Sequence, residues 1–208
     1  CGAHSKVNAS KAQALKMYYG DLDKKGATET IVASNKNGTY YPIDGLGELS
    51  SQLVYLRKKF NTYTSFAGKS IDEILGKERL GLATILNVNT LQSGYLENNN
   101  GSFAFVPFKF ELQTAPLMDF LVFDFDKDGK EEVLVGGNYF GVKPFHGRYD
   151  SFPGALIKSE KDIKLGNILG LDFMSKSVRH MNIVKLNNVA YLLVTMNNEK
   201  AQVYELLN

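Results

Sequence analysis

An acidic loop that runs straight into an apolar strand is the feature of this sequence that most constrains its fold. Acidic side chains stand at alternate positions at Asp124, Asp126 and Asp128, a sharp turn is available at Gly129, and Glu132 follows three residues later. Ca²⁺ takes about 6–8 oxygen ligands at about 2.3–2.6 Å. Without a cation, carboxylates this close together repel one another. The spacing therefore predicts a loop that wraps a divalent cation.

This loop is not an EF-hand. Position 12, counted from Asp124, is Val135, where an EF-hand requires a bidentate glutamate. The flanks Leu121–Phe123 and Val133–Val135 are short, apolar and β-rich, which is typical of buried strands. We therefore expect strand–loop–strand, or else a solvated acidic turn without an ion. The expected ligands are the side chains of Asp124, Asp126 and Asp128, the backbone carbonyl of Lys130, and Glu132, which closes the site.

A second copy of the loop lies 103 positions earlier, between Asp21 and Glu29. In this register Asp21, Asp23, Lys24, Gly26, Glu29 and Val32 match Asp124, Asp126, Lys127, Gly129, Glu132 and Val135. Internal repetition of this kind indicates a repeat architecture. The first copy carries Lys25 where the second carries Asp128. We therefore expect a degenerate metal loop, with Asp21, Asp23 and Glu29 keeping the turn.

The composition excludes several classes of protein. The chain has 208 residues, which corresponds to one domain or two, and 44% of them are hydrophobic, enough for a core. With 24 basic and 22 acidic residues, the net charge of +2 does not indicate nucleic-acid binding. No apolar run reaches the roughly 18 residues that a membrane span needs.

The single cysteine, Cys1, excludes an intrachain disulfide. Cys1 followed by Gly2 is either a lipoprotein cysteine exposed by removal of a signal peptide or the boundary of a fragment. The polar residues 1–12 are expected to be a flexible lead-in. A lipid anchor at Cys1 would place the protein outside the cytoplasm, in the periplasm or at the cell surface.

Turn signals and hydrophobic spacing predict an all-β domain over residues 13–208 with a small helical insertion at about 46–76. Leu49, Leu53, Leu56 and Phe60 fall at helical spacing, and Ser70 with Glu73 forms a capping-box sequence. The remainder reads as antiparallel strands joined by turns such as Asn37-Gly38 and Asn187-Asn188. In the C-terminal part, strands are expected at 155–158, 168–174, 179–186, 189–196 and 202–206.

The acidic pattern Asp-x-Asp-x-Asp-Gly-x-x-Glu resembles the calcium loop of FG-GAP/VCBS repeats, which are found in integrin-type β-propellers. Further segments resemble the C-terminal region of secreted or surface-exposed VCBS-repeat proteins of Bacteroidota. These segments are Tyr18-Tyr19-Gly20-Asp21, Tyr40-Tyr41-Pro42, Tyr95-Leu96-Glu97-Asn98 and Gly147-Arg148-Tyr149-Asp150.

The resemblance implies β-propeller-like blades, of which 208 residues hold about three or four. An open set of blades would expose sheet edges, through which a homo-oligomer is expected. It further implies a non-enzymatic, calcium-stabilised binding or scaffold domain outside the cytoplasm, with a protein or glycan as partner.

The segment Arg148, Tyr149 and Asp150 forms either a ligand-recognition loop or an internally paired connection. Besides the binding or scaffold domain, two other functions stay open. Asp119 and Asp150 would serve a carbohydrate-active enzyme, a lyase or hydrolase, if they met in space. The third reading is a purely structural repeat unit of a larger surface protein, which would carry neither a pocket nor an exposed aromatic patch.

Overall fold

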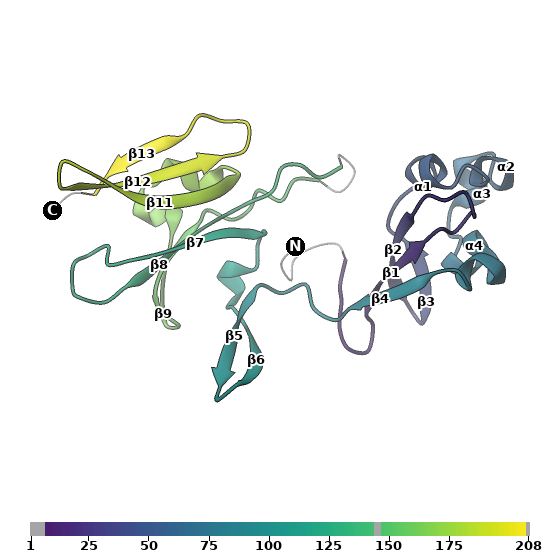
Figure 1. Cartoon of the computed structure of the whole chain (residues 1–208), viewed down its shortest axis with the longest axis horizontal. Helices are drawn as coiled ribbons and strands as arrows, with labels where there is room; N and C mark the ends of the chain where they lie inside the picture. Colours follow the sequence, from purple (N-terminus) through teal and green to yellow (C-terminus); the bar gives the residue numbers. More distant parts are fainter. Residues whose placement is uncertain (1–6, 144–146, 207–208) are drawn as a thin grey trace. The chain divides into compact units, whose positions relative to one another are not determined.

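The computed structural model describes residues 7–143 and 147–206 (Figure 1). Cys1 lies outside the described residues, and residues 7–12 of the expected lead-in belong to no helix or strand. Contacts divide the chain into two compact units that meet in sequence at Leu91 and Gln92. This division rests on the contacts inside each unit, and it does not test whether the two units belong to one propeller. The single propeller-like domain expected over 13–208 therefore stays a prediction.

The N-terminal unit is built on an antiparallel sheet with the strand order β3-β2-β1-β4. Its strands are β1 (Leu15–Gly20), β2 (Glu29–Lys36), β3 (Thr39–Pro42) and β4 (Thr84–Val88). The turn between β2 and β3 uses Asn37 and Gly38, both with positive φ, as the asparagine–glycine pair predicts.

The expected helical insertion is present and extends to residue 80. It comprises α1 (Leu46–Gln52), α2 (Leu56–Lys59), α3 (Tyr63–Phe66) and α4 (Ile71–Leu80), which lie against the β1–β4 sheet (Figure 1). The predicted end near Gly76 is a kink instead. Gly76 takes a left-handed φ of 71°, which breaks the helix for one residue before it resumes.

The capping box predicted at Ser70 begins α4. Ser70 Oγ accepts a hydrogen bond from the backbone N–H of Glu73 at 3.2 Å, and Glu73 Oε2 accepts one from the N–H of Ser70 at 2.9 Å. The backbone bond from Ser70, together with Lys69, lowers the pKa of Glu73 to about 2.

A single core joins this sheet to its helices. The sheet contributes the buried Tyr18, Ile31 and Ala33. The helical insertion supplies the facing side of this core, including the four residues at helical spacing identified in the sequence, Leu49, Leu53, Leu56 and Phe60. Ile71 and Ile74 of α4 are buried in the same core.

The C-terminal unit contains three antiparallel sheets within its described residues. One has the order β10-β9-β8-β7, one has the order β11-β12-β13, and β5 pairs with β6 as a hairpin. The strands are β5 (Gly94–Asn99), β6 (Ser102–Pro107), β7 (Leu117–Phe123), β8 (Glu132–Gly137), β9 (Ala155–Ser159), β10 (Asp162–Leu165), β11 (Val178–Leu186), β12 (Val189–Met196) and β13 (Gln202–Glu205).

The strand expected at 168–174 is wrong. This segment forms the short helix α5 (Gly166–Leu169) and a 3₁₀ helix, Asp172–Ser175. Gly170 between them has a left-handed φ of 69°, which ends α5 and turns the chain. The short apolar run imitates a strand because periodicity alone does not separate the two structures over so few residues.

The all-β prediction is confirmed, since strands hold 41% of the residues and helices 17%. The described strands form four antiparallel sheets, one of which is the two-stranded β5–β6 hairpin, and their assignment as propeller blades stays a prediction. Closure of these sheets into a propeller stays a prediction. Within the described part of the chain, every helix is too short or too polar to cross a membrane.

Candidate metal centre

The acidic loop between β7 and β8, residues 124–132, is the connection of an antiparallel hairpin, as predicted. Phe123 pairs with Glu132 across the two strands, so the loop leaves and re-enters the sheet at one end. Glu132 is the first residue of β8 and only 2% exposed. Its Oε2 accepts a hydrogen bond from the backbone N–H of Phe125 at 2.9 Å, which holds the carboxylate under the loop.

Two residues with positive φ shape the backbone of the 124–132 loop. Lys127 and Gly129 have left-handed φ values of 59° and 86°. Asp124 Oδ2 then accepts a hydrogen bond from the N–H of Gly129 at 3.1 Å, and Asp128 Oδ1 accepts one from the N–H of Lys130 at 2.8 Å. Lys130 therefore lies in the loop where the sequence places it, and the part of its carbonyl in binding an ion stays a prediction.

Four carboxylates converge in this loop. One oxygen from each of Asp124, Asp126, Asp128 and Glu132 lies within 4.8 Å of all the others, close enough to hold a metal ion. Asp124 Oδ1 is buried and has no hydrogen-bond partner among the described residues. A buried carboxylate oxygen without a partner is costly, and a bound cation would remove that cost.

An ammonium group contacts this cluster from the neighbouring strand. Lys158 on β9 donates its Nζ to Asp126 Oδ2. The hydrogen bond lowers the pKa of Asp126 and raises the pKa of Lys158. Both groups thus stay charged together near neutral pH, and the lysine neutralises one of the four carboxylates.

The 21–29 loop between β1 and β2 repeats this geometry. Gly20 pairs with Glu29, the pair that corresponds to Phe123 and Glu132. Glu29 is 4% exposed, and its Oε2 accepts a hydrogen bond from the N–H of Leu22 at 2.8 Å. Asp21 Oδ2 accepts one from the N–H of Gly26 at 2.9 Å. The repeat found in the sequence is therefore a repeat of structure.

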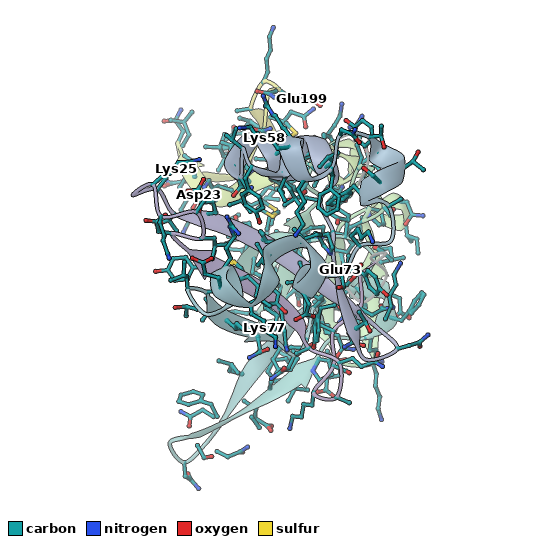
Figure 2. The ribbon with its side chains drawn as sticks, turned by 90° about the vertical axis from the view of Figure 1, so that its right-hand side faces the viewer. Asp23, Lys25, Lys58, Glu73, Lys77 and Glu199 are labelled. Carbon is teal, nitrogen blue, oxygen red and sulfur yellow. The ribbon has the colours of Figure 1, made fainter. Side chains whose placement is uncertain are left out.

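The 21–29 loop differs at Lys25. Lys25 Nζ lies 2.7 Å from Asp23 Oδ2, and the Asp23 side chain is only 5% exposed (Figure 2). Asp21, Asp23 and Glu29 still bring one oxygen each within 4.8 Å of the others. The lysine supplies a positive charge inside the loop itself, which is the physical reason to expect weaker metal binding here.

The other predicted residues have local partners. The guanidinium of Arg148 lies 3.7 Å from Asp150 and 3.9 Å from the ring centre of Phe140. Tyr149 forms a backbone bridge with Tyr139. These contacts match the internally paired connection, and a ligand-binding part for Arg148, Tyr149 and Asp150 stays a prediction.

The carboxylate of Asp119 also has a structural partner. It accepts a hydrogen bond from the backbone N–H of Met181 at 2.5 Å, which links β7 to β11. Asp150, its suggested catalytic partner, is paired with Arg148.

Sequence reasoning missed two residues that shape the C-terminal unit. The part of Lys158 could not be predicted, because its contact partner Asp126 lies 32 positions away in the sequence. Asn138 is fully buried with a left-handed φ of 73°, and an asparagine directly after the glycine pair Gly136-Gly137 was the signal available for it.

Comparison of the chain with protein-family models, with curated proteins and with solved structures gives no match. The resemblance to FG-GAP/VCBS repeats therefore stays an expectation based on the loops themselves.

Proposed function

We propose that this chain is a non-enzymatic binding or scaffold domain that works outside the cytoplasm and is stabilised by Ca²⁺ in the 124–132 loop. One observation carries the proposal: four carboxylates converge, and the buried Asp124 Oδ1 has no hydrogen-bond partner among the described residues. The four side chains are carboxylates, so every ligand atom that they can offer to a metal ion is an oxygen. Hard cations are the ions that prefer such ligands.

Calcium fits this donor set better than magnesium does. Mg²⁺ demands near-ideal octahedral geometry and usually keeps several waters, being held by one or two carboxylates. Ca²⁺ accepts 6–8 oxygens in flexible geometry. The side chains of Asp124, Asp126, Asp128 and Glu132, with the Lys130 carbonyl and water, supply such a shell.

Exposed aromatic surface favours binding over a purely structural part. On the β5–β6 hairpin, Phe103 is 63% exposed and Phe105 is 43% exposed. A cavity lies beside this hairpin in the same unit. Solvent-exposed aromatic groups and a pocket are what a protein or glycan partner would contact. The exposed edges of the sheets remain the expected surface for a homo-oligomer.

Isothermal titration of the chain with Ca²⁺ tests the proposal. We expect one ion to bind per chain, and Asp126→Ala to weaken binding by at least about a hundredfold, because one charged ligand is lost. Asp150→Ala removes a carboxylate of the same unit outside the loop and should leave the affinity unchanged. Absence of calcium uptake, or equal uptake by the Asp126→Ala variant, would refute the site.

Lys25→Asp should convert the 21–29 loop into a second calcium site. The substitution removes the ammonium from Asp23 and places a carboxylate at the position of Asp128. Titration should then give two ions per chain. Lys24→Asp is the matched control: it changes the charge equally, but at the position of Lys127, which is not a ligand. A stoichiometry that stays at one in Lys25→Asp contradicts the equivalence of the two loops.

A further inference from the structure

A cavity of about 350 Å³ lies within the C-terminal unit, next to the 124–132 loop. Its wall comes from the β5–β6 hairpin, the segment that follows it, and strands β8, β9 and β10. Most of this wall is apolar, including Tyr95, Phe108, Val133, Ile157 and Ile163. The volume falls in the range of about 300–1,000 Å³ typical of small-molecule sites.

Few polar groups stand on this wall. Glu160 is engaged, because Tyr95 donates its hydroxyl to the Glu160 carboxylate at 3.1 Å. Glu131 precedes the metal ligand Glu132, so the loop itself forms part of the wall. The cations are Lys109 and Lys158. An apolar enclosure with a small number of placed charges is suited to an amphiphilic ligand of low molecular weight.

Lys158 belongs to the cavity and to the metal loop at once. It lines the cavity, and its Nζ donates a hydrogen bond to Asp126 Oδ2. A cation that takes Asp126 as a ligand competes with this ammonium for the same carboxylate. Binding of the ion would therefore release Lys158 as a charged donor at the cavity wall.

We propose that the cavity binds a small ligand with an aromatic or aliphatic body and one carboxylate, and that Ca²⁺ in the 124–132 loop promotes this binding by releasing Lys158. The inference rests on the proposed calcium site. The apolar wall takes the body of the ligand, and the released ammonium pairs with its carboxylate. Because coupling between two sites is reciprocal, the ligand must tighten calcium binding by the same factor.

Indole-3-propionate is a suitable probe, because the chain has no tryptophan and indole fluorescence can be excited at the red edge of its absorption band, where the tyrosines of the chain absorb little. We expect saturating Ca²⁺ to lower the dissociation constant of this carboxylate about tenfold, within the usual range of coupling between sites. The neutral indole-3-propionamide has the same body and should change by less than about twofold, since it has no charge for Lys158 to pair with.

Substitution of Lys158 separates the coupling from the calcium site. Lys158→Gln removes the competitor and one positive charge, so calcium alone should bind about tenfold more tightly. The same variant should bind the carboxylate with an affinity that no longer depends on calcium. Lys158→Arg keeps the charge and should keep the coupling. Lys109→Gln changes the other lysine of the wall and should leave calcium affinity unchanged.

The outcomes distinguish the two proposals. If the wild-type chain takes up no calcium, both fail. If calcium binds but carboxylate affinity does not respond to it, or if Lys158→Gln leaves calcium affinity unchanged, this inference fails while the calcium site stands. Equal responses of the carboxylate and the amide would likewise overturn the pairing with Lys158.

Discussion

Replacing Glu132 with glutamine is expected to abolish the stabilisation by Ca²⁺ that we propose for this protein. An ion that binds only the folded state adds about 2.7 kcal/mol to the free energy of unfolding when its concentration is a hundredfold above its dissociation constant. Glu132 closes the 124–132 loop from a buried position, and glutamine nearly preserves its shape while removing its charge. Thermal unfolding with calcium and with a chelator measures the difference.

Glu29→Gln is the matched control for this experiment. Glu29 occupies the same position in the 21–29 loop, is equally buried, and accepts the corresponding backbone hydrogen bond from Leu22. Without calcium, each variant weakens its charge-assisted hydrogen bond but also relieves repulsion within its carboxylate cluster, so the stability of each should change by no more than about 1 kcal/mol. Only Glu132→Gln should lose the calcium effect. A calcium-dependent shift that survives in this variant would show that Glu132 is not a ligand.

Replacing Asn138 with alanine is expected to destabilise the C-terminal unit by about 3 kcal/mol, because buried backbone groups lose their partners. Asn138 Nδ2 donates to the carbonyls of Phe152 and Lys176 at 2.8 and 3.2 Å. Its Oδ1 accepts a hydrogen bond from the N–H of Phe152 at 3.0 Å. The Asn138 side chain thus links the segments at Phe152 and at Lys176 to the end of β8 by hydrogen bonds.

Hydrogen exchange measured by mass spectrometry locates this loss, which should raise exchange in peptides covering residues 138–143, 147–152 and 176–179. Asn100→Ala is the control, because Asn100 also has a left-handed φ, of 54°, but lies exposed in the β5–β6 turn. It should cost about 1 kcal/mol, the penalty of that conformation alone. Equal effects of the two variants would contradict a special part for the buried amide.

Local patterns made much of the fold and of the candidate metal centre predictable. Alternating carboxylates with a glycine at the turn predicted the 124–132 loop, and the same pattern 103 positions earlier predicted its twin. The strand pairs at either side followed from β-rich apolar runs and asparagine–glycine turns. In each case the residues that determine the structure lie within about ten positions of one another, so their spacing carries the information.

Segments governed by competing local tendencies were read less well. The apolar run at 168–174 imitated a strand, although Gly170 divides it into two short helical turns. Strand β10 was overlooked although Ile163 and Leu165 alternate with polar residues. Both segments are so short that tertiary packing, rather than propensity, decides their conformation.

By itself, the sequence determined the all-β class, the helical insertion and the two acidic loops, because hydrophobic period, turn chemistry and ligand spacing are properties of neighbouring residues. Only the tertiary structure decided that Lys158 neutralises Asp126, that Asn138 forms hydrogen bonds with Phe152, and that a cavity lies beside the 124–132 loop. Each of these depends on residues far apart in the chain, which meet only because antiparallel strands pair in a particular register.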